Sequence, residues 1–226
     1  MKYSEDLPLM RNLPRAALPT NEPLILASGS PRRAQLLRAA GYEFTIKPAS
    51  DSAECGICSG DTAPQFVAKN GYLKAVDVAR DIDSGLVVGA DTVACCDGQI
   101  LGKPRDEEHA EAMLRMLRGR DHDVLTGICV WSAKEQKGVV DVVATSLKML
   151  AFSDTMLADY LDSMMWEGKA GAFGFQDGND WLSVQGDGSE TNVVGLPMER
   201  FAEILENFDS IADPLTTDSK TPLPKK

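Results

Sequence analysis

Hydrophobic residues recur along the chain with two different spacings. Short apolar runs bounded by turn residues predict strands, whereas apolar residues three and four positions apart predict helices. The expected strands cover 24–27, 42–48, 86–90, 124–131, 138–152 and 181–185, with a hairpin over 93–101 around Asp97-Gly98. The expected helices cover 31–40, 64–81, 106–118 and 154–165, and a last helix has Pro197 at its first position. This order predicts one large α/β domain.

The first of these helices has an unusual start. Ser30 occupies the N-cap position, and Pro31 follows where its missing N–H costs nothing. Arg32 and Arg33 come next, although the positive end of the helix dipole disfavours cations there. An anion bound by the N–H groups of the preceding turn and by both guanidinium groups explains this arrangement. A solvated arginine pair beside a good cap is the alternative.

A carboxylate follows the apolar run 86–90 directly. We expect this residue, Asp91, where the strand ends. Ligands of open α/β sheets bind beyond strand ends, so Asp91 is a candidate metal ligand or base. A solvated aspartate that only turns the chain is the competing interpretation. The hairpin that follows can bring Lys103 back beside Asp91, where it would neutralise transferred charge, unless it is only a surface charge.

Two further segments place charged groups near this region. The polar loop 49–61 contains Glu54, a hard oxygen ligand. Lys74 lies beside the apolar stripe of the helix over 64–81, a position from which its ammonium group can point into the site. Gly71 weakens this helix by roughly 1 kcal/mol relative to Ala, so tertiary packing or a close approach must compensate.

A glycine-rich segment over 168–176 is the remaining candidate. Its Lys169, Gln176 and exposed backbone suit recognition of a base or phosphate, although such loops are common without a function. The sequence contains neither GxxxxGK[ST] nor GxGxxG, so the standard nucleotide-binding loops are absent.

The overall charge narrows the choice of ligand. The formal net charge of −11, from 23 Lys and Arg against 34 Asp and Glu, disfavours binding to nucleic acid polymers or anionic membranes. Against this background the stretch 24–38 holds three arginines and no acid, which points to a small anionic ligand. No apolar run approaches the roughly 20 residues of a membrane span, and residues 1–22 lack the apolar core of a secretory signal. We therefore expect a cytoplasmic protein.

The five cysteines are an odd number, as expected where thiols stay reduced. Four of them, Cys55, Cys58, Cys95 and Cys96, could together ligate zinc, but the adjacent pair lacks the spacer of a zinc knuckle. Buried or loop thiols are the simpler interpretation. Only two histidines are present, which argues against a catalytic zinc. The cations Arg32, Arg33, Lys74 and Lys103 and the carboxylates Glu54 and Asp91 instead suit a polyphosphate bound with Mg²⁺ or Mn²⁺.

Six short motifs in order resemble one family. LASGSPRR at 26–33, VGADTV at 88–93, GKPRD at 102–106, LTG at 125–127, KAGAFGFQ at 169–176 and NVVGLP at 192–197 resemble the Maf nucleoside triphosphate pyrophosphatases. The resemblance implies a mixed α/β fold of the Maf/ITPase-like type, with an elongated curved sheet flanked by helices and an active-site cleft between two lobes. It also implies metal-dependent hydrolysis of a nucleoside triphosphate to the monophosphate and pyrophosphate. A homodimer is suggested by the resemblance alone.

The resemblance assigns roles to individual residues. It implies phosphate binding by Ser28, Ser30, Arg32 and Arg33, acidic site residues at Glu54 and Asp91, and further polar site positions at Lys74, Lys103, Thr126, Lys169 and Gln176. In the resulting hypothesis, Glu54 and Asp91 hold the metal that orients the attacking water. Asp91 shares in accepting its proton, while Lys103 and the other cations stabilise the departing pyrophosphate.

The motifs also bear on which base the substrate nucleotide carries. SPRR combined with Gln176 is similar to the subgroup that acts on dTTP and UTP, whereas Phe173, Phe175 and Asp177 depart from the usual residues of that loop. A pyrophosphatase of another modified nucleotide, such as a methylated GTP, is one alternative. A division-regulating nucleotide sensor without turnover is another, although a sensor does not need the two carboxylates.

The resemblance, together with the proline-bearing and polar composition of both ends, divides the chain. Residues 23–208 form the expected catalytic domain, preceded by an extension outside the core over 1–22 and followed by a mobile tail over 209–226.

Overall fold

A single mixed β-sheet organises the part of the chain that the computed structural model describes, residues 10–56, 60–176 and 180–213. Its seven strands are β1 (Leu24–Leu26), β2 (Phe44–Ile46), β3 (Leu86–Cys96), β4 (Gln99–Leu101), β5 (Asp121–Ser132), β6 (Lys137–Met149) and β7 (Leu182–Val184). They run in the order β2-β1-β3-β5-β6-β7, with β4 paired to β3. β1 pairs in parallel with β2 and β3, and the remaining pairs are antiparallel. The expected α/β class with a mixed sheet is therefore confirmed.

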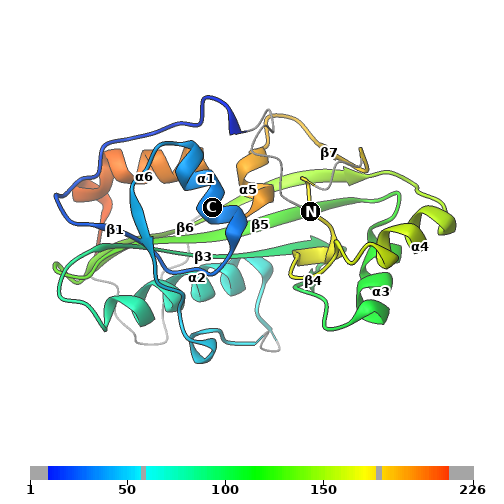
Figure 1. Cartoon of the computed structure of the whole chain (residues 1–226), viewed down its shortest axis with the longest axis horizontal. Helices are drawn as coiled ribbons and strands as arrows, with labels where there is room; N and C mark the ends of the chain where they lie inside the picture. The colour runs from blue at the N-terminus through cyan, green and yellow to red at the C-terminus, as the bar shows by residue number, and fades with distance from the viewer. Residues whose placement is uncertain (1–9, 57–59, 177–179, 214–226) are drawn as a thin grey trace.

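The helices cover both faces and one end of the sheet (Figure 1). They are α1 (Pro31–Ala39), α2 (Ala63–Ala79), α3 (Glu107–Leu117), α4 (Asp154–Asp162), α5 (Glu190–Val194) and α6 (Met198–Ile211). In Figure 1, α1, α5 and α6 lie above the strands, α2 lies below them, and α3 and α4 lie at the right-hand end. Within the described residues, no helix is long and apolar enough to cross a membrane.

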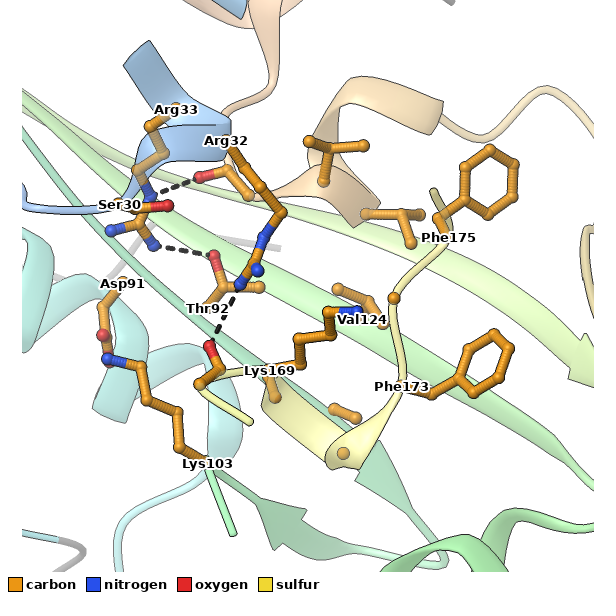
Figure 2. A pocket seen from close by; sticks show the side chains of 18 of the residues that line it. Ser30, Arg32, Arg33, Asp91, Thr92, Lys103, Val124, Lys169, Phe173 and Phe175 are labelled. Carbon is orange, nitrogen blue, oxygen red and sulfur yellow. Dashed lines mark hydrogen bonds between the residues drawn. The ribbon is translucent and has the colours of Figure 1, made fainter. Parts of the chain in front are cut away.

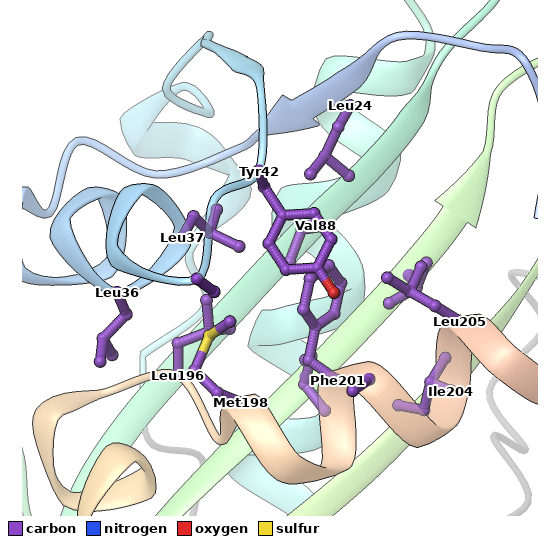
Figure 3. Close-up of a cluster of buried hydrophobic side chains, with 14 of the residues drawn as sticks. Leu24, Leu36, Leu37, Tyr42, Val88, Leu196, Met198, Phe201, Ile204 and Leu205 are labelled. Carbon is purple, nitrogen blue, oxygen red and sulfur yellow. The ribbon is translucent and has the colours of Figure 1, made fainter. Parts of the chain in front are cut away.

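Successive side chains of a strand point to opposite faces of the sheet, and a separate hydrophobic core lies on each face. Leu24, Leu26 and Val88 face α1 and α6, where they pack with Tyr42 and Phe201 (Figure 3). Ile25, Ala27 and Val87, their neighbours in sequence, point the other way, as the two-residue period of a strand requires, and pack against α2 together with Cys129 and Trp131. A third cluster fills the far end between the sheet, α3 and α4.

Glycines allow α2 to lie directly on the sheet. A Cβ on Gly89 would stand 2.2 Å from the Gly71 carbonyl oxygen, and a Cβ on Gly127 would stand 2.1 Å from that of Val67. Both distances are far below van der Waals contact, so only glycine permits this approach. The tight packing expected around Gly71 is thus present, and it brings the α2 side chains close to β3.

The strand that carries Asp91 is longer than its sequence pattern predicts. β3 continues to Cys96, because β5 remains paired with it through Cys95 opposite Asp123. The expected strand end at Asp91 is therefore wrong. The parallel neighbour of β3 stops earlier, because β1 ends at Leu26, opposite Val88. The antiparallel pairing with β4 begins only at Ala94, so one edge of β3 is open between these two partners.

Both ends of the described chain differ from expectation. Residues 10–22 were expected outside the core, yet Met10, Leu13 and Leu18 pack against it, and the backbone N–H of buried Ala16 donates to the Tyr42 hydroxyl at 2.9 Å. At the other end, α6 continues two residues beyond 209, where the tail was expected to begin. Residues 1–9 and 214–226 lie outside the described part, so the proposed division of the chain stays a prediction.

Two local predictions near the C-terminus also change. The short helix α5 was not predicted; it begins after Ser189, whose hydroxyl accepts a hydrogen bond from the Asn192 N–H at 3.0 Å. Pro197 is the N-cap of α6 rather than its first helical residue. Together these two elements turn the chain back toward the open edge of β3.

Candidate active site

A cavity of about 400 Å³ lies at the open edge of β3. It is bounded by the start of α1, the loop before α2, strands β3 and β5, the segment after β4, the 167–176 loop and the end of α5. Nearly all of the site residues expected from sequence line it: Ser28, Ser30, Arg32, Arg33, Glu54, Lys74, Asp91, Lys103, Lys169 and Gln176. The fold therefore gathers residues that are far apart in the sequence.

Arg33 is held rigidly at one end of the cavity. Its Nε donates to the Gly195 carbonyl oxygen at 2.7 Å, Nη1 to Ser28 Oγ at 3.0 Å and Nη2 to Thr92 Oγ1 at 3.1 Å (Figure 2). Burial lowers the pKa of the guanidinium, an effect that the negative charge of Asp91 opposes. An arginine stays cationic even so. Within the described part of the chain, three of its five N–H groups are paired, and the other two can bind an anion.

Arg32 bridges two walls of the cavity. From α1 its Nη2 donates to the Gly168 carbonyl oxygen at 3.0 Å, so the helix start and the glycine-rich loop are joined across the opening (Figure 2). Ser30 caps α1 only through its position, because its side chain makes no cap hydrogen bond. Its backbone N–H instead donates to Ser28 Oγ at 3.2 Å. The start of α1 thus combines a helix dipole with two cations, which is an arrangement suited to a phosphate group.

A buried lysine links the two carboxylates. Lys74 Nζ lies 2.7 Å from Asp91 Oδ1 and 2.9 Å from Glu54 Oε1, and only 7% of its side chain is exposed. The interpretation that Lys74 points into the site rather than into solvent is confirmed. Burial by itself raises the pKa of the Glu54 carboxyl, but Lys74 and, further away, Lys103 and Arg33 bring it below its ordinary value. Glu54 is therefore an anion at neutral pH.

Asn70 connects the backbone of Cys55, the residue after Glu54, to the Asp91 carboxylate. Its Oδ1 accepts from the Cys55 N–H at 3.0 Å, while its Nδ2 donates to the Cys55 carbonyl oxygen and to Asp91 Oδ2, both at 3.3 Å. The residue is 2% exposed. The backbone N–H and the carboxylate fix which way the amide points, since each can pair with only one of its ends. Asn70 thereby holds the loop that carries Glu54 against the strand that carries Asp91.

Lys103 and Lys169 supply further positive charge. Lys103 is exposed and extends toward Asp91, as was expected from the hairpin (Figure 2). Lys169 is 4% exposed and belongs to the glycine-rich loop. The two segments are tied together, because the Gly171 N–H donates to the Gly102 carbonyl oxygen at 3.0 Å.

Thr126 is not among the residues that line the cavity. It is fully buried, and its hydroxyl lies 2.9 Å from Thr92 Oγ1 and 3.1 Å from the Asn192 carbonyl oxygen. The structure thus places Thr126 behind Thr92, which is the residue that contacts Arg33. Direct contact between Thr126 and a ligand, expected from sequence, is not supported by this position.

The other end of the cavity is largely apolar. Its walls come from β3, β5, β6, β7, the end of α3 and the glycine-rich loop, and include Ala94, Leu117, Val124, Leu147, Met149 and Leu182. Two polar side chains border this region. His122 Nδ1 and both amide atoms of Gln176 are buried, and they have no hydrogen-bond partner within the described residues. The cavity therefore has a charged end and an apolar end.

The carboxylates also provide a test of the implied metal. Glu54 and Asp91 both approach Lys74, and the described residues contain no group of three or more His, Cys, Asp or Glu side chains that could hold a metal ion. Two oxygen ligands fit Mg²⁺, which proteins usually bind through one or two carboxylates together with substrate phosphates. Cys58, one member of the alternative zinc set, lies outside the described residues.

Sequence reasoning missed three residues of this site, each of which had a recognisable signal. Thr92 directly follows Asp91 in a motif already singled out. Asn70 stands four positions before Lys74, so the two polar residues share one otherwise apolar face of a helix. His122 stands two positions before Val124, so it belongs to the inward-facing set of its strand.

Comparisons with known proteins agree with this geometry. The model of the Maf-like protein family matches residues 23–208. A dTTP/UTP pyrophosphatase of Rhodopirellula baltica is 63% identical over 213 residues, which are 92% of this chain and 94% of that protein. The dTTP/UTP pyrophosphatases of Geotalea uraniireducens and Clostridioides difficile are 40% and 37% identical, each over 83% of this chain and 96% of the relative. Since the family match covers most of the sequence and the site motifs meet in one cavity, the chain belongs to the Maf family.

Proposed function

We propose that this protein hydrolyses UTP and dTTP between the α and β phosphates, giving the nucleoside monophosphate and pyrophosphate. The observation that carries this proposal is the gathering of Arg32, Arg33, Lys74 and Lys103 with two carboxylates at one end of a single cavity. The substrate class is supported by the relatives named dTTP/UTP pyrophosphatase.

The start of α1 binds the phosphates in this proposal. The two free N–H groups of Arg33 and the guanidinium of Arg32 provide charge-assisted hydrogen bonds, and the helix dipole adds a fixed positive potential. Because Arg33 is already anchored to Ser28, Thr92 and Gly195, it does not need to be ordered when the substrate binds. This preorganisation stabilises the charge that develops on the departing pyrophosphate.

Asp91 is the proposed proton acceptor. The oxygen of a water molecule attacks the α phosphorus, its proton passes to the Asp91 carboxylate, and the bond from the α phosphorus to the bridging oxygen breaks. Lys74 donates a hydrogen bond of 2.7 Å to one oxygen of the Asp91 carboxylate, and Asn70 orients the second carboxylate oxygen. Lys103 is placed to neutralise charge on the leaving group.

We further propose Mg²⁺ or Mn²⁺ as cofactor, with Glu54 and Asp91 as its protein ligands. When bound, such an ion supplies Lewis-acid activation of the phosphate and of the attacking water. A homodimer and a location in the cytoplasm, where nucleoside triphosphates are available, complete the proposal; both rest on the family resemblance and the expected substrate.

Pyrophosphate release from a panel of nucleoside triphosphates tests the proposal. The panel contains UTP, dTTP, CTP, ATP and GTP together with methylated uridine and guanosine forms, each with Mg²⁺, with Mn²⁺ and with a chelator. We expect release from UTP and dTTP that requires the metal. Preferential release from a methylated GTP would reassign the substrate. Tight nucleotide binding without any release would favour a sensor and overturn the enzymatic proposal.

A further inference from the structure

His122 occupies the inner face of β5 at the apolar end of the cavity. Residues 121–124 alternate between exposed and buried, so His122 and Val124 point inward while Asp121 and Asp123 point to solvent. Across the strand pair His122 lies opposite Leu147, which also lines the cavity. The imidazole is 7% exposed, and its surroundings inside the cavity are mainly hydrocarbon.

Among the residues that the structure describes, His122 Nδ1 has no hydrogen-bond partner, which is unusual for a buried polar atom. Leaving a buried polar atom without a partner destabilises the folded state, so such atoms call for an explanation. Gln176, on the glycine-rich loop, likewise has no hydrogen-bond partner among the described residues for its amide oxygen or its amide nitrogen. His122 and Gln176 lie on different walls of one cavity. A ligand with a polar edge between these two side chains would supply hydrogen-bond partners for both.

The charge of His122 restricts what that ligand can be. Burial lowers the pKa of the imidazole, an effect only opposed by the Arg120 backbone and by Asp123 and Asp121. The neutral imidazole that results has one N–H and one lone pair. It is therefore a hydrogen-bonding group and not an additional cation for the phosphates.

The spacing of residues along β5 places His122 about one nucleoside length away from the charged end of the cavity. Thr92, which anchors Arg33, is paired with Thr126, and His122 is four residues further along β5, about 13 Å at 3.3 Å per residue. Val124 lies between these two positions on the same face, where it borders the glycine-rich loop in Figure 2. A nucleotide whose phosphates contact α1 can thus extend its base toward His122.

We infer that His122, together with Gln176, reads the N3–O4 edge of uracil or thymine and rejects cytosine. Either neutral tautomer has this effect. If Nδ1 carries the proton, it donates to O4, whereas cytosine presents an amino group there. If Nδ1 is unprotonated, it accepts a hydrogen bond from the N3–H group, which cytosine lacks. In both cases the wrong base places two groups of like polarity in contact in an apolar pocket, which discriminates strongly.

This inference rests on the proposed hydrolysis of UTP, and substitution of His122 tests it in the full-length enzyme. In His122→Phe, we expect kcat/KM for UTP to fall about 10- to 100-fold and the preference for UTP over CTP to shrink to within a few-fold, since a hydrogen bond in an apolar site is lost. Inhibition by pyrophosphate, which occupies only the charged end, stays unchanged. His122→Asn places an amide near Nδ1 and restores part of the preference.

The second histidine provides the matched control. His109 lies on α3 away from the cavity, where its Nδ1 accepts from the Arg105 N–H at 3.3 Å. His109→Phe is expected to keep the wild-type ratio of UTP to CTP hydrolysis. An unchanged ratio in His122→Phe, even with slower turnover, would overturn the inference, as would an equal loss in His109→Phe.

A direct measurement separates this inference from the proposed function and does not depend on how the variant folds. The nitrogen NMR resonance of His122 Nδ1 is followed in the ¹⁵N-labelled wild-type protein during titration with UMP, with CMP and with pyrophosphate. We expect a shift with UMP alone. If UMP binds without shifting this resonance, the proposed role of His122 is refuted. Absence of pyrophosphate release from UTP, with the UMP-induced shift present, refutes the catalytic proposal instead.

Discussion

The two ends of the cavity satisfy their polar groups in opposite ways. At the charged end, Lys74 contacts two carboxylates, and Arg33 donates to three oxygen atoms of the protein. At the apolar end, His122 and Gln176 retain buried polar atoms that no described residue satisfies. The charged end is thus rigid before any ligand binds, whereas the apolar end is completed by a ligand.

This difference separates reactivity from selectivity. The charged end is built mainly from α1, α2 and β3, and its groups suit any nucleotide because they contact the phosphates, which all nucleotides share. The apolar end is built from β5 and the glycine-rich loop, and its groups are neutral. Substitutions at the first end should therefore alter turnover for all substrates, and substitutions at the second should alter the choice among them.

Removal of the proposed proton acceptor has the largest expected effect. Asp91→Asn keeps the size of the side chain and one oxygen for Lys74, but the amide cannot accept the proton. We expect kcat to fall about 10³-fold with every substrate, the usual range for loss of a general base. Steady-state kinetics and the melting temperature are the measurements. Asp97→Asn, an exposed carboxylate on the same hairpin, is the control. Turnover of Asp91→Asn within tenfold of the wild type excludes the assigned role.

The second prediction concerns the geometry of the phosphate cations. Arg33→Lys keeps the charge but loses the planar fork that holds Ser28, Thr92 and Gly195. We expect kcat/KM to fall about 10- to 100-fold for UTP and CTP alike, since charge-assisted hydrogen bonds contribute about 1.5 to 3 kcal/mol each. Arg32→Lys, which loses a single bond to Gly168, should lose less. Equal effects in the two variants would show that only charge matters at this end.

The third prediction tests whether the two carboxylates must be held together. Asn70→Leu removes the bonds to Cys55 and Asp91, and we expect kcat to fall about tenfold with little change in KM, because a small misplacement of catalytic groups slows the reaction. Asp77→Ala is the matched control on the same helix: Asp77 accepts from the Ser50 N–H at 2.8 Å but does not contact Asp91. A similar loss in both variants would mean that anchoring of the loop, and not orientation of Asp91, is what counts.

The sequence predicts the charged end better than the apolar end for a physical reason. Caps and charge placement are local, so the start of α1 with Ser30, Pro31 and the arginine pair could be predicted from neighbouring residues. The continuation of β3 past Asp91 depends on pairing with β5, and the packing of residues 10–22 depends on a core formed by distant segments. Neither leaves a local signal in the sequence.

The role of His122 illustrates the same limit. Its position in the alternating pattern of β5 predicts that it points inward, but the lack of a partner for Nδ1 emerges only when β6 and the glycine-rich loop are in place. For the same reason Thr126 looked like a ligand-binding residue within the LTG motif, whereas pairing of β3 with β5 puts Thr92 in front of it. Motifs identify the segment, and tertiary pairing decides which side chain reaches the cavity.

The smallest predicted effect is a pH dependence of stability that arises at the apolar end. Burial lowers the pKa of His122 in the folded protein below the ordinary 6.5, so the unfolded chain binds a proton more readily. The stabilisation due to neutral His122 is complete above pH 6.5 and is lost as the pH falls toward the lowered pKa. Between pH 7 and pH 5 the free energy of unfolding of the wild type should therefore fall relative to that of His122→Phe, by at most about 2 kcal/mol at 1.36 kcal/mol per pH unit. Urea denaturation of both proteins across this range measures the difference. A constant difference would mean that the imidazole titrates alike in both states, and the apolar end would then be open enough to solvate a charge.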